Sequence, residues 1–263
     1  RIDMRITGSS EIELFNLQDN AHVVSPCLII HGKCLKSVNA RMMQVSHPQL
    51  PPVTYPINEQ FFKATIILTP GENVLTFVTD TNVKKTVTCF YTPMLQNPPV
   101  HLCLLLAKDS PLQYDCPKVQ KEREGGNGLE LAIQKMKIGA RLMQAFTNEQ
   151  MLRNGFGDRT FRFEEEFGDD PTFRQSVGKR NSVKIHLIRS DKTTKELRDH
   201  NLAQQNPKAS DAGGLFGIAM DALRKYGGPF NDSERPAQAA VMFLDTHWDG
   251  EFITAHAALG GGD

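Results

Sequence analysis

The sequence predicts a chain of two parts, an all-β domain over residues 1–95 and an α/β domain over residues 96–263. Short segments with strand-like patterns follow one another through the first part, and none shows a helical period. Three prolines within residues 92–99 then interrupt the pattern, because proline cannot continue a strand ladder. Residues 100–107 follow as an almost continuous apolar run, which is typical of a strand buried on both faces of an α/β sheet.

The first part is predicted to be an immunoglobulin-like β-sandwich. Between two of its strands, Pro70 and Gly71 occupy the central positions of a type II turn, where proline and a residue with positive φ are preferred. Such domains are usually spacers or docking surfaces, and no ligand site is predicted in this part. The strands are expected near residues 11–15, 27–33, 63–68, 74–78 and 85–91.

The second part alternates strands and helices. Residues 128–152 carry apolar side chains at helical spacing and predict a long amphipathic helix whose methionines pack in the core. Further helices are expected at residues 193–201, where Thr193 and Glu196 can form a capping box, and at residues 212–226. The remaining strands are expected at residues 183–188, 240–244 and 252–259, with a polar loop at residues 108–126.

The composition is that of a soluble globular protein. Hydrophobic residues make up 40% and charged residues 23% of the 263 residues. Basic residues number 30 and acidic residues 30, so no overall charge favours nucleic acid, and no apolar run is long enough to span a membrane. The five cysteines are scattered singly, which predicts reduced, buried thiols in a cytoplasmic protein rather than a disulfide or a metal site.

The first candidate for a polar site lies between the last two predicted strands. Asp245, His247 and Asp249 alternate there, so an extended chain would place them on one face, where they could bind a divalent cation or serve an unrelated α/β enzyme. The interpretation that we favour is a turn formed by the Asp and Gly residues, with Trp248 packed on a neighbour. His256 lies in an apolar strand and is expected to be a hydrogen-bonded core residue.

Two polar features precede that segment. Glu164, Glu165 and Glu166 could take part in acid–base or metal chemistry, but a solvated edge or pairing with nearby arginines is favoured because a run of acids has no fixed geometry. His186 lies on the polar side of an alternating strand and is predicted to face solvent. The sequence contains no HExxH, no GxSxG and no glycine fingerprint for nucleotides. No complete active site is therefore predicted.

Three long segments resemble a fungal family of zinc metallopeptidases that has a member in budding yeast. They are residues 126–167, which contain GNGLELAIQKMKIGARLMQAF, residues 196–209 (ELRDHNLAQQNPKA) and residues 246–263 (THWDGEFITAHAALGGGD). The resemblance covers the chain from about residue 98 onward. It implies a zincin-like α/β domain in which an HExxH helix binds zinc, and the helix glutamate activates water to hydrolyse a peptide or protein substrate.

In that layout the strand before the metal helix is an exposed edge that can hold an extended peptide. The chain ends at Asp263, before any HExxH. It is therefore expected to be the N-terminal portion of such a peptidase, inactive by itself, with no catalytic residue or zinc ligand of its own. The alternative is a non-catalytic module that binds proteins through the β-sandwich and the edge strand. The resemblance assigns the edge to Thr254, Ala255, His256, Ala257, Ala258, Leu259, Gly260 and Gly261.

Overall fold

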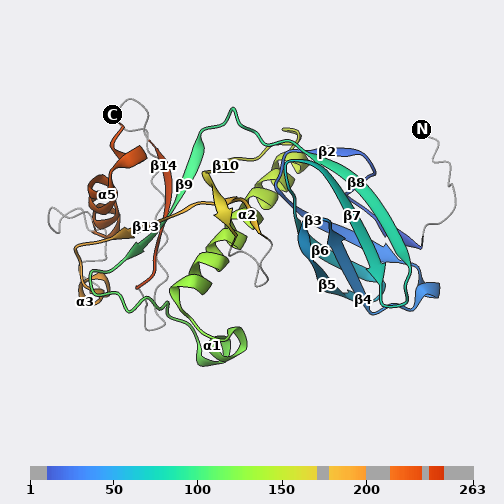
Figure 1. Ribbon diagram of the computed structural model, residues 1–263, viewed down its shortest axis with the longest axis horizontal. Helices are drawn as coiled ribbons and strands as arrows, with labels where there is room; N and C mark the ends of the chain where they lie inside the picture. Colours follow the sequence, from blue (N-terminus) through green and yellow to red (C-terminus); the bar gives the residue numbers. More distant parts are fainter. Residues whose placement is uncertain (1–10, 171–177, 200–213, 233–236, 246–263) are drawn as a thin grey trace. The chain divides into compact units, whose positions relative to one another are not determined.

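The chain divides into two compact units, each of which is described here by itself. The computed structural model describes residues 11–170, 178–199, 214–232 and 237–245 (Figure 1). The first unit comprises residues 1–98, 138–162 and 167–180, and the second comprises residues 99–137, 163–166 and 181–263. Each unit is thus built from segments that are distant in the sequence, and the predicted domain boundary at residues 95/96 stays a prediction.

The first unit is built on an eight-stranded sheet. Its strands hydrogen-bond in the order β1-β3-β6-β5-β4-β7-β8-β2, and the neighbours are antiparallel except for the parallel pair β2 and β8. A 3-10 turn, η1 (Lys36–Val38), follows β3. The strands are β1 (Ile12–Leu14), β2 (Ala21–Val23), β3 (Cys27–Cys34), β4 (Met42–His47), β5 (Leu50–Asn58), β6 (Phe61–Ile67), β7 (Gly71–Thr79) and β8 (Lys84–Tyr91).

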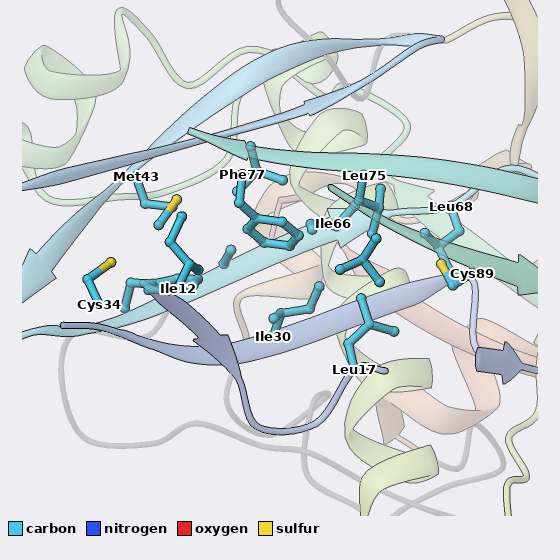
Figure 2. Packing of buried hydrophobic residues seen from close by; sticks show 14 of the residues in the cluster. Ile12, Leu17, Ile30, Cys34, Met43, Ile66, Leu68, Leu75, Phe77 and Cys89 are labelled. Atoms are coloured by element: carbon cyan, nitrogen blue, oxygen red, sulfur yellow. The ribbon is translucent and has the colours of Figure 1, made fainter. Parts of the chain in front are cut away.

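One hydrophobic core lies inside this curled sheet. Alternate residues point inward along the strands, as with Phe62, Ala64 and Ile66 on β6. Leu75 and Phe77 on β7 are fully buried, and Figure 2 shows them packed with side chains from β1 and β3. The predicted β-rich first part is confirmed. The finer prediction of an immunoglobulin-like sandwich stays a prediction, because the strands form a single hydrogen-bonded series.

The turn before β7 has the backbone that its sequence predicts. Gly71 has a φ of 94°, a left-handed value that glycine adopts without steric cost. The Asn73 side chain holds the turn, because its Nδ2 donates to the carbonyl oxygens of Thr69 and Gly71, each at 2.9 Å. His47 of β4 reaches the same amide, with its Nε2 2.8 Å from Asn73 Oδ1.

The second unit contains a mainly parallel sheet around β9 (Pro99–Leu106). β13 (Ile185–Arg189) and β14 (Gln238–Phe243) both pair with β9 in parallel, and β10 (Arg162–Phe163) is also its neighbour. The side chains from Leu102 to Leu106 are buried, which confirms the prediction of a strand covered on both faces. β11 (Glu165–Asp169) and β12 (Lys179–Val183) form a separate pair.

Helices accompany this sheet. α5 (Gly214–Tyr226) packs Ala219, Ala222 and Leu223 against Cys103, Leu105 and Ile188 in one cluster of buried side chains. The short 3-10 helix η2 (Gly228–Asn231) follows it. α3 (Thr194–Leu197) begins with the predicted capping box of Thr193 and Glu196. The predicted polar loop at residues 108–126 is corrected, because it contains α1 (Lys118–Glu124), a helix with no buried residue and therefore no apolar period to reveal it.

The long helix is α2 (Leu129–Arg153), and its length confirms the prediction. The prediction that its methionines pack in the core needs correction. Met136 is buried, but Met143 is 47% exposed. Polar side chains lie inward instead, and some find partners there: Lys137 Nζ donates to Ser182 Oγ at 2.7 Å, and Gln144 Nε2 donates to Phe161 O at 2.9 Å. The buried polar residues of α2 are Lys137, Arg141, Gln144 and Asn148, and its exposed apolar residues include Ile138, Leu142 and Phe146.

Among the helices of the described residues, none has the length and apolar character needed to cross a membrane. The four cysteines Cys27, Cys34, Cys89 and Cys103 are buried, as predicted, and Cys116 is partly exposed.

Candidate metal centre

Three side chains from neighbouring parts of the second sheet converge on one point. They are His101 of β9, Glu164 directly after β10, and His186 of β13. Glu164 Oε2 lies 2.6 Å from His101 Nδ1 and 2.7 Å from His186 Nε2. The three candidate ligand atoms all lie within 4.8 Å of one another. We call these three residues the His–Glu–His cluster.

The backbone explains why they meet. β13 pairs with β9 in parallel so that His186 lies opposite Cys103. Cys103 is two residues after His101, and the two therefore lie on the same face of β9. Glu164 joins the starts of both strands through its own peptide groups. Its N–H donates to Val100 O at 3.0 Å, and its carbonyl oxygen accepts from the Lys184 N–H at 2.9 Å. The side chains are therefore positioned by sheet hydrogen bonds rather than by a loop.

The Glu164 carboxylate is the negative centre of the cluster. Its second oxygen, Oε1, accepts a hydrogen bond from Lys184 Nζ at 2.8 Å. Partial burial opposes ionisation, but the hydrogen bonds from Lys184, His186 and His101 outweigh it and lower the pKa of Glu164 to about 2. The group is consequently an anion at neutral pH.

The hydrogen bonds assign the imidazole protons. An ionised carboxylate only accepts, so His101 Nδ1 and His186 Nε2 must each carry a proton and donate to Oε2. His186 Nδ1 is then free to accept from the hydroxyl of Tyr226, which lies 3.3 Å away. Every polar atom named in this paragraph is thus satisfied by a partner.

Aromatic rings cover the histidines. Tyr226 ends α5 and Phe230 lies in η2, and both rings pack edge-on against the histidines of the cluster. The Phe230 centroid lies 5.5 Å from the ring centroids of both His101 and His186. His101 and His186 are 8% and 3% exposed, whereas the Glu164 side chain keeps 25% of its surface accessible. The cluster is closed on the aromatic side and reaches solvent through Glu164.

The predicted orientation of His186 is wrong. Residues 183–188 do not form one continuous strand, because β12 ends at Val183 and β13 begins at Ile185. The alternation of inward and outward side chains therefore does not continue unchanged from Val183 into β13. Within β13, His186 and Ile188 point inward and Leu187 is 41% exposed. The favoured interpretation of the three glutamates also needs correction for Glu164, which pairs with two histidines and a lysine rather than with solvent or arginine.

Asp245 lies in a structural hydrogen-bond network rather than in the His–Glu–His cluster. It is 1% exposed, and its carboxylate accepts from the Ala107 N–H at 2.7 Å and from Ser110 Oγ at 2.8 Å. Its carbonyl oxygen accepts from Arg198 Nε at 2.8 Å. The other residues of that predicted site, His247 and Asp249, lie outside the described residues, as does the whole predicted edge from residue 254 to residue 261.

Sequence reasoning missed His101. The only signal was a histidine within an apolar strand, which on its own favours a hydrogen-bonded core residue.

Comparison with known proteins identifies the family. A family model described as "Putative peptidase family" matches residues 11–263. The chain belongs to this family. A protein of Saccharomyces cerevisiae named "Putative zinc metalloproteinase" is 66% identical over 258 residues, which is 98% of this chain and 37% of the relative. A protein of Schizosaccharomyces pombe with the same descriptive name is 34% identical over 264 residues, which is 96% of this chain and 39% of the relative. The chain thus spans less than two fifths of the length of either relative, and the resemblance to a fungal zinc metallopeptidase family is confirmed.

Proposed function

We propose that this chain is the N-terminal portion of a zinc-dependent peptidase that hydrolyses peptide bonds with a metal-activated water. The observation that carries the proposal is the family match over residues 11–263, together with relatives named as zinc metalloproteinases. A peptidase acts on a peptide or protein substrate. Under this proposal residues 96–263 belong to a zincin-like domain, residues 1–95 form its immunoglobulin-like companion, and the enzyme works in the cytoplasm.

The His–Glu–His cluster does not fit the catalytic zinc of such an enzyme. Its donors are of the right type, because two histidines and a glutamate hold zinc in some metallopeptidases. A catalytic zinc also keeps an open position that faces the substrate. Here Phe230 covers both imidazoles and Lys184 is bonded to the carboxylate. We therefore place the catalytic zinc outside this chain and derive no catalytic step from the cluster.

The segment from Thr254 to Gly261 is proposed to hold the substrate. Its sequence predicts an apolar strand that runs into glycines, and an extended peptide can pair with the main chain of such an edge. Ala257→Pro in the full-length enzyme removes one backbone N–H and is expected to raise KM about tenfold, roughly the value of one hydrogen bond. Ala257→Ser, which keeps the N–H, serves as the matched control.

The test of the peptidase is made on the full-length protein. We expect it to cleave an unfolded protein substrate, to lose cleavage when a zinc chelator is added, and to regain cleavage when zinc is restored. A zinc-loaded, folded full-length protein that cleaves nothing but binds the same substrate saturably would reject the peptidase and support the non-catalytic binding module instead.

A further inference from the structure

We infer that the His–Glu–His cluster is a zinc site of its own, which ties three strands of the second unit together and is separate from catalysis. Its ligands are His101 Nδ1, Glu164 Oε2 and His186 Nε2. The inference does not depend on the proposed peptidase activity, because all three ligands lie within this chain and no substrate needs to reach them.

The donor set selects the ion. Two imidazole nitrogens and one carboxylate oxygen suit zinc, whereas calcium and magnesium prefer oxygen ligands alone. The three atoms already lie within 4.8 Å of one another, so a central ion needs only small side-chain movements. The three side chains supply three of the four positions that zinc usually has, and a water molecule on the Glu164 side would supply the fourth. Catalytic zinc sites have this ligand count as well, so the separation from catalysis rests on the Phe230 ring over both imidazoles and on the position of the cluster in the sheet.

Two of the three ligands, Glu164 and His186, already have the outer hydrogen bonds that zinc ligands usually make. Lys184 Nζ holds Glu164 Oε1, which leaves Oε2 for the ion. The Tyr226 hydroxyl lies beside His186 Nδ1, the nitrogen that faces away from the centre. Such partners fix the orientation of ligands and are a regular feature of zinc sites. The ammonium of Lys184 offsets the charge of the carboxylate and is expected to moderate the affinity.

The proton balance of binding is simple. In the ion-free state each imidazole donates its N–H to Glu164 Oε2. When zinc binds, those two nitrogens give up their protons, and each imidazole takes a proton on its other ring nitrogen. If both rings are neutral in the ion-free state they stay neutral, the new His186 Nδ1–H donates to the Tyr226 hydroxyl oxygen, and no net proton is released.

The position in the sheet favours a structural ion. His101 and His186 lie near the starts of two parallel strands, whereas ligands of parallel α/β sheets bind outside the carboxyl ends of the strands. Glu164 adds the segment after β10 to the same point. An ion there would join segments that are far apart in the sequence and stabilise the folded state by mass action.

The experiment titrates the metal-stripped 263-residue chain with zinc chloride and measures bound zinc together with the melting temperature. We expect one zinc ion per chain, a rise in melting temperature, and no comparable effect of magnesium. His101→Gln and His186→Gln should each lower the zinc affinity by at least about tenfold. His31→Gln, a change at an exposed histidine of β3, is the control and should keep full binding.

A second variant guards against failure to fold. Tyr226→Phe keeps the ring and removes only the outer hydrogen bond, so it should fold normally and lose roughly tenfold in zinc affinity. A folded wild-type chain that retains no zinc at micromolar free zinc would overturn the inference. Binding that is unchanged in His101→Gln, His186→Gln and Tyr226→Phe would overturn it as well, since the ion would then lie elsewhere. Neither result would bear on the full-length peptidase test.

Discussion

At the scale of single residues, Gly32 shows how closely the first unit is packed. A Cβ at this position would overlap the Phe62 ring and would lie 2.8 Å from Glu13 O. Its φ is not in the left-handed region, so lack of space rather than backbone strain requires glycine. We expect Gly32→Ala to lower the free energy of unfolding by about 1–3 kcal/mol through overpacking, measured by urea denaturation.

Two further variants test that reason. Gly32→Ala combined with Phe62→Leu should lose less stability than the sum of the single changes, because the smaller side chain makes room. Gly139→Ala is the matched control, since a Cβ there meets nothing within 4 Å in the interior of α2. It should raise the free energy of unfolding by about 0.5–1 kcal/mol. Equal losses at both glycines would contradict the packing argument.

The buried thiols should be chemically inert. Burial raises the pKa of Cys27 to about 12 and that of Cys89 to about 11, and burial with the nearby Glu164 charge raises the pKa of Cys103 to about 12. These groups stay protonated at pH 8, and the thiolate is the reactive form. Iodoacetamide should therefore modify Cys116 in the native chain and spare these three until denaturant is added, as mass spectrometry can show. Rapid native labelling of Cys103 would contradict the described core.

The histidines of the cluster show the limit of sequence reasoning at this scale. Apolar and polar residues alternate around His186, which predicted that His186 faces solvent. The strand is interrupted at Lys184, and His186 lies on the buried face instead. His101 and Glu164 are 63 residues apart and meet through strand pairing. Local periodicity contains no information about that pairing, so the cluster could not be predicted although each residue type was visible.

At the scale of elements, α2 has an inward face and an exposed apolar face that its sequence does not distinguish. Phe146 is 63% exposed and Met136 is 6% exposed. Phe146→Glu should change the free energy of unfolding by no more than about 0.5 kcal/mol, as is usual for surface changes. Met136→Ala should lower it by about 2–4 kcal/mol, because it leaves a cavity. Thermal denaturation of both variants checks the orientation of the helix, and the reverse ranking would show it to be wrong.

Asp245 stabilises the end of β9 by accepting the N–H of Ala107, which is fully buried. Asp245→Ala leaves that donor without a partner and should cost about 1–3 kcal/mol. Asp245→Asn retains an acceptor oxygen and should cost less. Urea denaturation of the two variants distinguishes a structural hydrogen bond from a side chain kept for catalysis. If both proved as stable as the wild type, the structural role of Asp245 would be rejected.

Elements with their own local signals were predictable. The continuous apolar run predicted β9, and the helical spacing of apolar residues predicted α2. Thr193 and Glu196 predicted the start of α3. α1 has no buried residue and left no apolar pattern to detect. The order of the strands in the first sheet was also beyond reach, because register and neighbours depend on contacts between distant segments.

At the scale of the whole molecule, two roles for zinc can be separated. The proposed peptidase would use a catalytic ion, whereas the second, inferred ion would lie among His101, Glu164 and His186. The first role concerns substrate hydrolysis, whereas the second concerns the sheet of the second unit. Each can fail without the other, because the first depends on the family and the second on the positions of three side chains in this chain.

The most direct measurement of the central structural claim is a crystal structure of the chain grown with zinc, with anomalous data collected at the zinc absorption edge. We predict an anomalous peak roughly 2.0–2.2 Å from His101 Nδ1, Glu164 Oε2 and His186 Nε2, the usual lengths of zinc bonds to nitrogen and oxygen. A structure grown with zinc that shows no peak there, and in which both imidazoles still donate to Glu164, would contradict it.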